Sequence, residues 1–283
     1  MLDAELKAHI QNTHKINIKQ ATALTGGDIN AVYLLETSTK KLVIKVNDAK
    51  RYPRMFAAEK AGLETLRAPK VIDVPKPIAI GEFQDLSYLL LEYKASAKKD
   101  PKFWTRFGEQ LAQLHKQSNA TFGYSQNNYI GSLPQYNAQS NTAGEFYIDQ
   151  RLKPQLALAK QNGFTFNVLE DFYKKLKTII PKEPPALVHG DLWSGNYIVN
   201  QHGDPCLIDP AVAYAPREMD IAMMHLFGGF EPQLFSAYNA TFPLLDGWQG
   251  RIKLWQLYYI LVHLNLFGRS YLASAKAILK QYS

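Results

Sequence analysis

Three polar residues in the second half of the chain have the types and the spacing needed to handle a phosphate group. Asp191 and Asn196 are separated by four residues, and Asp209 follows a short apolar run. Phosphoryl transfer from ATP needs a carboxylate that orients and deprotonates the attacking hydroxyl. It also needs an amide oxygen and a second carboxylate that hold magnesium ions on the phosphates. The order of the three residues therefore predicts that Asp191 is the catalytic base and that Asn196 and Asp209 bind Mg²⁺.

The same residues match a known loop pattern. In protein kinases the catalytic loop reads His-Arg-Asp-x-x-x-x-Asn and a metal-binding Asp-Phe-Gly follows it. Here the segments read His-Gly-Asp-Leu-Trp-Ser-Gly-Asn over residues 189–196 and Asp-Pro-Ala over residues 209–211. The alternative is a capped loop whose polar side chains merely bond nearby backbone. We favour the catalytic interpretation because spacing, order and the downstream acid all agree with it. The flanking apolar residues predict a hairpin that turns at residues 201–204.

The N-terminal third supplies candidates for binding the ATP phosphates. Gly26 and Gly27 form a predicted turn where backbone amides can approach phosphate oxygens, with an ordinary hairpin as the alternative. Lys45 lies among branched apolar residues in a predicted strand, similar to the Val-Ala-Ile-Lys strand of kinases; a solvent-facing lysine is the alternative. The helical stretch that follows carries Glu59, the expected ion-pair partner of Lys45, with Glu64 as the competitor.

A predicted buried strand over residues 87–93 ends in polar residues. In a two-lobed kinase this strand leads into the hinge between the lobes, whose backbone bonds the adenine edge. We therefore expect the backbone of Leu91, Glu92 and Tyr93 to contact the adenine of ATP.

The patterning predicts an α+β protein with a two-lobed, protein-kinase-like fold. Residues 1–93 are expected to form a β-rich N-lobe on the phosphate and adenine side of ATP. Residues 94–283, which begin with a polar and alanine-rich crossing, are expected to form a mainly helical C-lobe with the catalytic, metal and substrate sites. An amphipathic helix is predicted over residues 103–115. The loop over residues 122–137 is rich in aromatic and amide groups that could line a polyol site.

Composition argues against several other classes of protein. Of 283 residues, 46% are hydrophobic, which is enough for real cores, and no apolar run is long enough to span a membrane. The net charge is +7, but the basic residues are dispersed rather than gathered in a stripe, so we expect no nucleic-acid partner. The single cysteine, Cys206, excludes an internal disulfide, and no secretory segment is apparent at the N-terminus. We expect a cytoplasmic protein without a membrane partner.

Four further polar residues follow the catalytic segment. Asp220 precedes a helical run and is expected to cap it while bonding back to the catalytic loop. Arg217 and Glu218 form either a local ion pair or contacts to the substrate. His263 is either a satisfied core histidine, which we favour, or part of the substrate wall.

On these residues the chain resembles the fructosamine kinase (ketosamine-3-kinase) family, which has the protein-kinase-like, aminoglycoside-phosphotransferase fold. Trp193 and the segment Asn-Tyr-Ile-Gly at residues 128–131 point to this branch, as does Leu-Phe-Gly-Gly-Phe at residues 226–230. The chain departs from the family pattern at Ala143, where members carry tryptophan, and at Arg269, where glycine is usual. Both departures bear on substrate range rather than on the catalytic residues.

The resemblance implies phosphorylation of the 3-hydroxyl of a ketosamine, with ATP and Mg²⁺. The substrates would be ribulosamine, erythrulosamine or fructosamine adducts of a protein or a free amino acid, and decomposition of the product implies deglycation. Asp191 would accept the 3-hydroxyl proton, and the indole of Trp193 would pack against the sugar or its amine. Arg217, Glu218 and His263 are further substrate candidates.

Two alternatives stay open. Another small-molecule kinase of the same fold would act on an aminoglycoside, choline or a homoserine-like alcohol. An aminoglycoside is a polycation, and its binding site would be expected to carry acidic residues. The C-terminal segment 273–283 contains none, which argues against this substrate. A non-catalytic nucleotide-binding scaffold is the other alternative, and the intact Lys45, Asp191, Asn196 and Asp209 argue against it. The preferred ketosamine and the choice between monomer and homodimer are left open.

Overall fold

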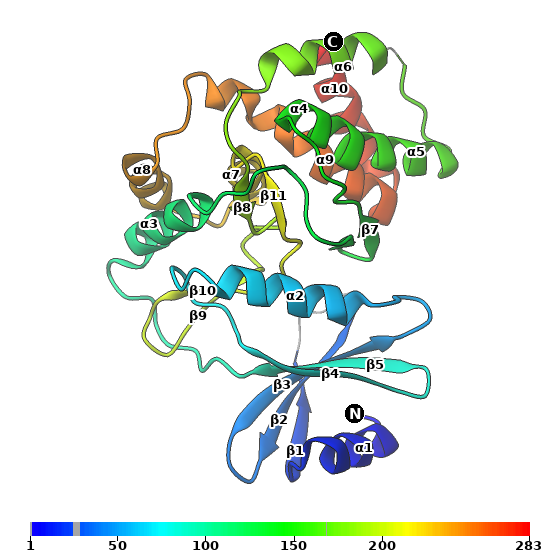
Figure 1. Cartoon of the computed structure of the whole chain (residues 1–283), viewed down its shortest axis with the longest axis vertical. Coiled ribbons are helices and arrows are strands. Elements are labelled where there is room, and N and C mark those ends of the chain that lie inside the picture. The colour runs from blue at the N-terminus through cyan, green and yellow to red at the C-terminus, as the bar shows by residue number, and fades with distance from the viewer. Residues whose placement is uncertain (1, 25–28, 168) are drawn as a thin grey trace.

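The computed structural model describes residues 2–24, 29–167 and 169–283. The chain forms two lobes stacked along the long axis of the molecule, one built on a sheet and the other built from helices (Figure 1). This arrangement confirms the α+β, two-lobed fold expected from the sequence. Within the described ranges, no helix combines the length and the apolar character that a membrane-spanning segment requires.

The N-lobe holds a five-stranded antiparallel sheet in the order β1-β2-β3-β5-β4. Along β3, the alternation of a strand directs Leu42, Ile44 and Val46 to one face, where they pack into a core with α1. Lys45 points to the other face and reaches Glu59 on α2. The elements of this lobe are α1 (Ala4–His14), β1 (Ile18–Ala23), β2 (Ala31–Thr37), β3 (Lys41–Asp48), α2 (Met55–Arg67), β4 (Pro77–Phe83) and β5 (Leu86–Glu92).

The C-lobe is organised around α9, a 20-residue helix that packs against α5, α7 and α10 (Figure 1). Its apolar residues surround the helix instead of forming one stripe, which is typical of a helix inside a core. The predicted helix over residues 103–115 is confirmed as α3. The helices are α3 (Phe103–His115), α4 (Ala143–Phe146), α5 (Lys153–Gln161), α6 (Leu169–Ile179), α7 (Glu218–Phe227), α8 (Pro232–Thr241), α9 (Trp248–Phe267) and α10 (Leu272–Tyr282), with a π-helical turn at Tyr147–Leu152 and a 3-10 turn at Arg269–Tyr271.

Three small two-stranded sheets in the C-lobe carry the segments that hold the predicted site. The strands pair as β6 (Asn128–Ile130) with β7 (Leu133–Gln135), β8 (Ala186–Val188) with β11 (Ala213–Ala215), and β9 (Tyr197–Val199) with β10 (Pro205–Leu207). The β9–β10 pair confirms the hairpin predicted to turn at residues 201–204.

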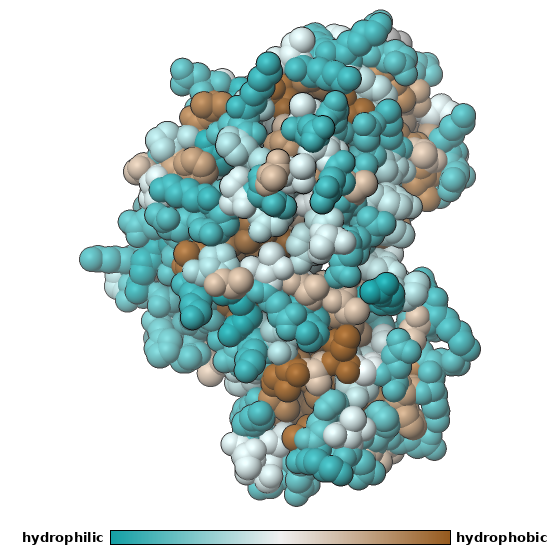
Figure 2. All heavy atoms as spheres, in the orientation of Figure 1, coloured by the Kyte–Doolittle hydropathy of each residue, from teal (hydrophilic) through white to brown (hydrophobic). Residues whose placement is uncertain are grey.

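One hydrophobic core cluster contains residues of both lobes. It contains Leu89 of β5 together with Leu192, which follows Asp191 directly, and Leu207 of β10. Burial of these side chains fixes the catalytic loop against the N-lobe sheet. Figure 2 shows hydrophilic residues over most of the face seen in Figure 1, with small apolar patches over the N-lobe sheet.

Candidate active site

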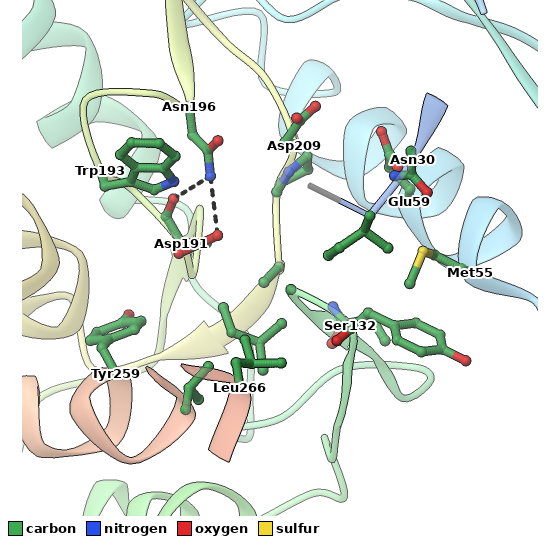
Figure 3. A pocket seen from close by; sticks show the side chains of 18 of the residues that line it. Asn30, Met55, Glu59, Ser132, Asp191, Trp193, Asn196, Asp209, Tyr259 and Leu266 are labelled. Atoms are coloured by element: carbon green, nitrogen blue, oxygen red, sulfur yellow. Dashed lines mark hydrogen bonds between the residues drawn. The ribbon is translucent and has the colours of Figure 1, made fainter. Parts of the chain in front are cut away.

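The catalytic loop runs from β8 to β9 and places Asp191 and Asn196 side by side. The amide nitrogen of Asn196 donates to the backbone oxygen of Asp191 at 2.8 Å and to its carboxylate at 3.1 Å (Figure 3). Loss of water around the carboxylate raises the pKa of Asp191 to about 7, although the Asn196 hydrogen bond opposes this shift. A carboxylate with a pKa near neutrality is suited to accept a proton from a hydroxyl.

Asp220, on α7, binds the backbone at the start of the catalytic loop. Its carboxylate accepts hydrogen bonds from the backbone N–H groups of His189 at 2.7 Å and Gly190 at 2.8 Å, and it contacts Nε2 of His115 at 3.2 Å. Burial alone would raise the pKa of Asp220, but the contact with His115 and the loop N–H groups outweigh it and hold the pKa below its usual value. The predicted support of the loop by Asp220 is confirmed, but its predicted role as a helix cap is wrong. Asp220 lies within α7, whose N-cap residue is Arg217 and has no side-chain cap hydrogen bond.

The Asp209 segment lies against the catalytic loop. Nε2 of His189 donates to the backbone oxygen of Ile208 at 2.8 Å, and the N–H of Ala211 donates to the backbone oxygen of His189 at 2.9 Å. Gly190 has a φ of +85°, and a side chain there would collide with the Ala211 carbonyl. The close approach of the two segments therefore requires glycine after His189.

A buried network of side-chain amides binds the backbone that follows Asp209. Gln135 donates to the backbone oxygen of Ala211 at 2.9 Å, and Asn128 donates to that of Val212 at 2.8 Å. Gln135 also donates to Asn128, and the hydroxyl of Tyr258 donates to Gln135 at 2.8 Å. These amides thus position the Asp209 segment. Asn128 also lines the pocket between the lobes together with residues 129–132, in agreement with the expectation that this loop lines a site.

Lys45 is buried between two carboxylates. Its Nζ lies 2.7 Å from Glu59 Oε1 and 2.5 Å from Asp209 Oδ1, which confirms the predicted pair with Glu59. Burial alone would lower the pKa of Lys45, but the charges of Asp209 and Glu59 outweigh it and raise the pKa. Glu64, the competing partner, instead binds Lys60 at the surface. Lys45 is therefore charged and directed toward Asp209.

A pocket of about 700 Å³ lies between the lobes and contains these groups. Glu59 and Asp209 line it on one side, together with Lys45, which binds both, and Asp191 and Trp193 line it on the other (Figure 3). Figure 3 shows Asp191 facing α9, away from Glu59 on α2. Five residues of α9 line this part of the wall: Tyr259, Val262, His263 and Leu266, which recur at helical spacing, and Phe267 at the end of the helix.

The pocket wall includes His263. The ring is half-buried, and its Nδ1–H donates to the backbone oxygen of Tyr259 at 2.7 Å. Burial lowers the pKa of His263, which keeps the ring neutral near neutral pH. The favoured interpretation of a satisfied core histidine is therefore incomplete, because the ring also lines the pocket.

Arg217 and Glu218 lie outside the residues that line this pocket. Arg217 Nη2 lies 2.5 Å from Glu183, and Glu218 accepts hydrogen bonds from Arg251 at 2.6 Å and from Trp255 at 2.7 Å. Both side chains are buried in these ion pairs, so neither is free to contact a substrate in the pocket. This corrects the expectation of a substrate role and also that of an ion pair between the two.

The remaining predictions for the ATP site concern the glycine pair and the end of β5. Gly26 and Gly27 lie outside the described residues. Leu91, Glu92 and Tyr93 occupy the end of β5 and the position after it, and the N–H of Glu92 donates to the backbone of Lys76 at 2.9 Å. The contact of this segment with adenine stays a prediction.

Comparison with known proteins places the chain in a family. A sequence profile described as fructosamine kinase matches residues 2–283. The chain belongs to the fructosamine kinase family. A Synechocystis relative named "Probable ketoamine kinase" is 39% identical over 267 residues, covering 93% of this chain and 90% of that protein. An Enterococcus faecium relative of the same name is 38% identical, covering 92% of this chain and 94% of that protein.

Solved structures agree with this assignment. A crystal structure from Haemophilus somnus, provisionally named fructosamine-3-kinase, superposes with a TM-score of 0.88 at 27% identity and covers 98% of this chain and 96% of that one. A spectinomycin phosphotransferase solved with ADP and spectinomycin has a TM-score of 0.58 at 15% identity, covering 97% and 93%, which shows a shared fold. As a member of the fructosamine kinase family, the chain is an ATP-dependent phosphotransferase.

The roles of Asn128, Gln135 and Tyr259 in and around the pocket were not predicted from the sequence. Asn128 belongs to the Asn-Tyr-Ile-Gly motif and Gln135 to the amide-rich loop, but nothing in their spacing indicates that they bond the backbone after Asp209. Tyr259 was not singled out, although its position four residues before His263 places both on one face of a helix.

Proposed function

We propose that this chain phosphorylates the 3-hydroxyl of a ketosamine, with Asp191 as the base. The observation that carries the proposal is the position of the Asp191 carboxylate, which opens into the same pocket as Lys45 and Asp209. A hydroxyl bound beside Asp191 would face a phosphate held on the Lys45 side, in the order that in-line transfer requires.

The proposed roles follow from the charges of the residues. Asp191 accepts the proton of the attacking hydroxyl, and Asn196 orients its carboxylate through the bond at 3.1 Å. Lys45, held by Glu59, places a positive charge next to the phosphates. The protein contributes mainly position and charge, because this reaction class involves little covalent chemistry with the enzyme.

Asn196 and Asp209 fit Mg²⁺ through their oxygen atoms. Asn196 uses its amide nitrogen for Asp191, which leaves its amide oxygen available as a metal ligand, and Asp209 supplies a carboxylate. Among the described residues there is no cluster of three or more His, Cys, Asp or Glu suited to a metal. This agrees with Mg²⁺, which is usually held by one or two carboxylates together with substrate phosphates. When bound, the ion would neutralise charge on those phosphates.

The acceptor side of the pocket favours a sugar carrying one amine. The wall from α7 and α9 is apolar and aromatic, formed by Met223, Phe227, Val262, Leu266 and similar residues, and none of its described members is acidic. A polycationic aminoglycoside would be expected to meet several carboxylates. The half-exposed indole of Trp193 can instead face a single secondary ammonium group. The relatives named ketoamine kinase support the same substrate class.

A phosphate at the 3-hydroxyl makes the adduct unstable, so that it decomposes and releases the amine. The expected biological result is deglycation of a protein or an amino acid. The experiment is ATP consumption with Mg²⁺ on ribulosamine, erythrulosamine and fructosamine adducts of lysine, with kanamycin and choline as competing acceptors. Phosphorus NMR of the product locates the phosphate. Turnover of a ketosamine at its 3-hydroxyl is expected; turnover of kanamycin or choline alone would overturn the proposal.

A further inference from the structure

The hydroxyl of Tyr259 is a buried polar group without a partner in the described protein. Tyr259 is fully buried, and its hydroxyl makes no hydrogen bond to any described residue. Yet Tyr259 belongs to the lining of the pocket. Figure 3 shows its side chain extending from α9 with the hydroxyl end toward Asp191. A buried polar group normally has a hydrogen-bond partner, so we expect a molecule bound in the pocket to supply the partner of this hydroxyl.

The surroundings of Tyr259 leave few other sources for that partner. The next wall residues on α9 are Val262, which is apolar, and His263, and the Tyr259 hydroxyl makes no hydrogen bond to either. Burial raises the pKa of the Tyr259 phenol well above its usual value, so the hydroxyl keeps its proton and can donate it. An acceptor oxygen on a bound molecule would satisfy it.

We propose that Tyr259 is a specificity-determining residue that donates a hydrogen bond to an oxygen next to the reacting hydroxyl of the acceptor. The inference rests on the proposed function, because the acceptor hydroxyl is assigned to Asp191. For a ketosamine phosphorylated at its 3-hydroxyl, the adjacent oxygens are the 2-keto and the 4-hydroxyl oxygens. An acceptor that lacks this oxygen leaves the phenol buried and unpaired, and sites built to bind an oxygen discriminate strongly against such analogues.

The preceding residue provides a matched control. Tyr258 is also buried, but its hydroxyl donates to Gln135 at 2.8 Å and it does not belong to the pocket lining. The two buried tyrosines therefore differ in two respects: the hydroxyl of Tyr258 has a hydrogen-bond partner within the protein and that of Tyr259 has none, and only Tyr259 lines the pocket. Removing each hydroxyl by substitution with phenylalanine keeps the ring and its packing.

The experiment compares Tyr259→Phe with Tyr258→Phe in the full chain, measuring stability in denaturant and steady-state rates with ketosamine. Tyr259→Phe is expected to keep or raise the stability, since it removes an unpaired buried group, and to lower kcat/KM for the acceptor by roughly 10- to 100-fold with the KM for ATP unchanged. Tyr258→Phe is expected to lower the stability, since it leaves Gln135 unpaired, with a smaller effect on kcat/KM.

Acceptor analogues test the identity of the bound oxygen. In the wild type, the 2-deoxo or the 4-deoxy analogue should lose about the same factor in kcat/KM as Tyr259→Phe does, and that analogue should lose little more in the variant. Loss for neither analogue, or an unchanged kcat/KM in Tyr259→Phe, would overturn the inference while the ketosamine activity stands. A wild type inactive on every ketosamine would overturn the proposed function and this inference with it.

Discussion

Replacing Asp220 by Asn will destabilise the protein and slow the reaction without touching the pocket. In the structure, the two carboxylate oxygens of Asp220 accept the N–H groups of His189 and Gly190 separately. An asparagine side chain has one oxygen, so it can satisfy one of these donors, and its NH₂ group must face the other. The change therefore leaves a buried backbone donor of the catalytic loop unpaired.

The magnitude follows from these contacts. An unsatisfied buried N–H costs about 1–3 kcal/mol, and loss of the charge from the remaining bond costs about 1 kcal/mol more. We expect a loss of about 2–4 kcal/mol in the free energy of unfolding. Because Asp191 follows Gly190 directly, its carboxylate should shift, and a displacement of about 1 Å can cost about 100-fold in kcat.

Urea unfolding measures the first effect and steady-state kinetics measure the second. Asp149→Asn is the control: Asp149 lies at the surface in an ion pair with Lys153 at 2.7 Å, and this change should alter stability by less than about 0.5 kcal/mol. If Asp220→Asn matched Asp149→Asn in both stability and kcat, the support assigned to Asp220 would be wrong.

Three further predictions concern other parts of the molecule. Glu59→Gln should raise the KM for ATP about 10-fold and leave the KM for the acceptor unchanged in initial-rate measurements, because Lys45 loses one of its two carboxylate partners; equal effects on both would contradict the assignment. Gly108→Ala should lower the free energy of unfolding by about 1–3 kcal/mol at unchanged KM values, since its Cβ would collide with the Leu234 carbonyl between α3 and α8. Burial lowers the pKa of His189, so the folded state excludes a proton that the unfolded chain binds below about pH 6.5; stability should therefore be full above that pH and decline as the pH falls, and a urea midpoint that rose on acidification would refute this.

Much of the site could be predicted because its residues are close in sequence or have fixed spacing. Asp191, Asn196 and Asp209 lie within one hairpin and its flanks, where local patterning sets the geometry. The pairing of Lys45 with Glu59 joins a strand to the next helix, and the position of Glu59 on the buried side of α2 was enough to choose it over Glu64.

Contacts between distant segments could not be predicted. Arg217 binds Glu183 and Glu218 binds Arg251, because the packing of the chain around α7 and α9 brings these groups together in the C-lobe. An adjacent Arg and Glu in sequence carry no information about which partner lies across a core. The unpaired hydroxyl of Tyr259 is likewise a property of the packed structure, since the sequence Tyr-Tyr does not distinguish a satisfied hydroxyl from an unsatisfied one.

The most direct test of the central claim is phosphate transfer to a ketosamine by the wild type and by Asp191→Asn, with nucleotide binding measured on both. The proposed base, Asp191, does not contact Lys45, the proposed phosphate-binding residue, which instead binds Glu59 and Asp209. The variant should therefore bind ATP with nearly unchanged affinity and lose turnover. Turnover near the wild-type rate in Asp191→Asn would contradict the account, because no other described carboxylate lines the acceptor side of the pocket.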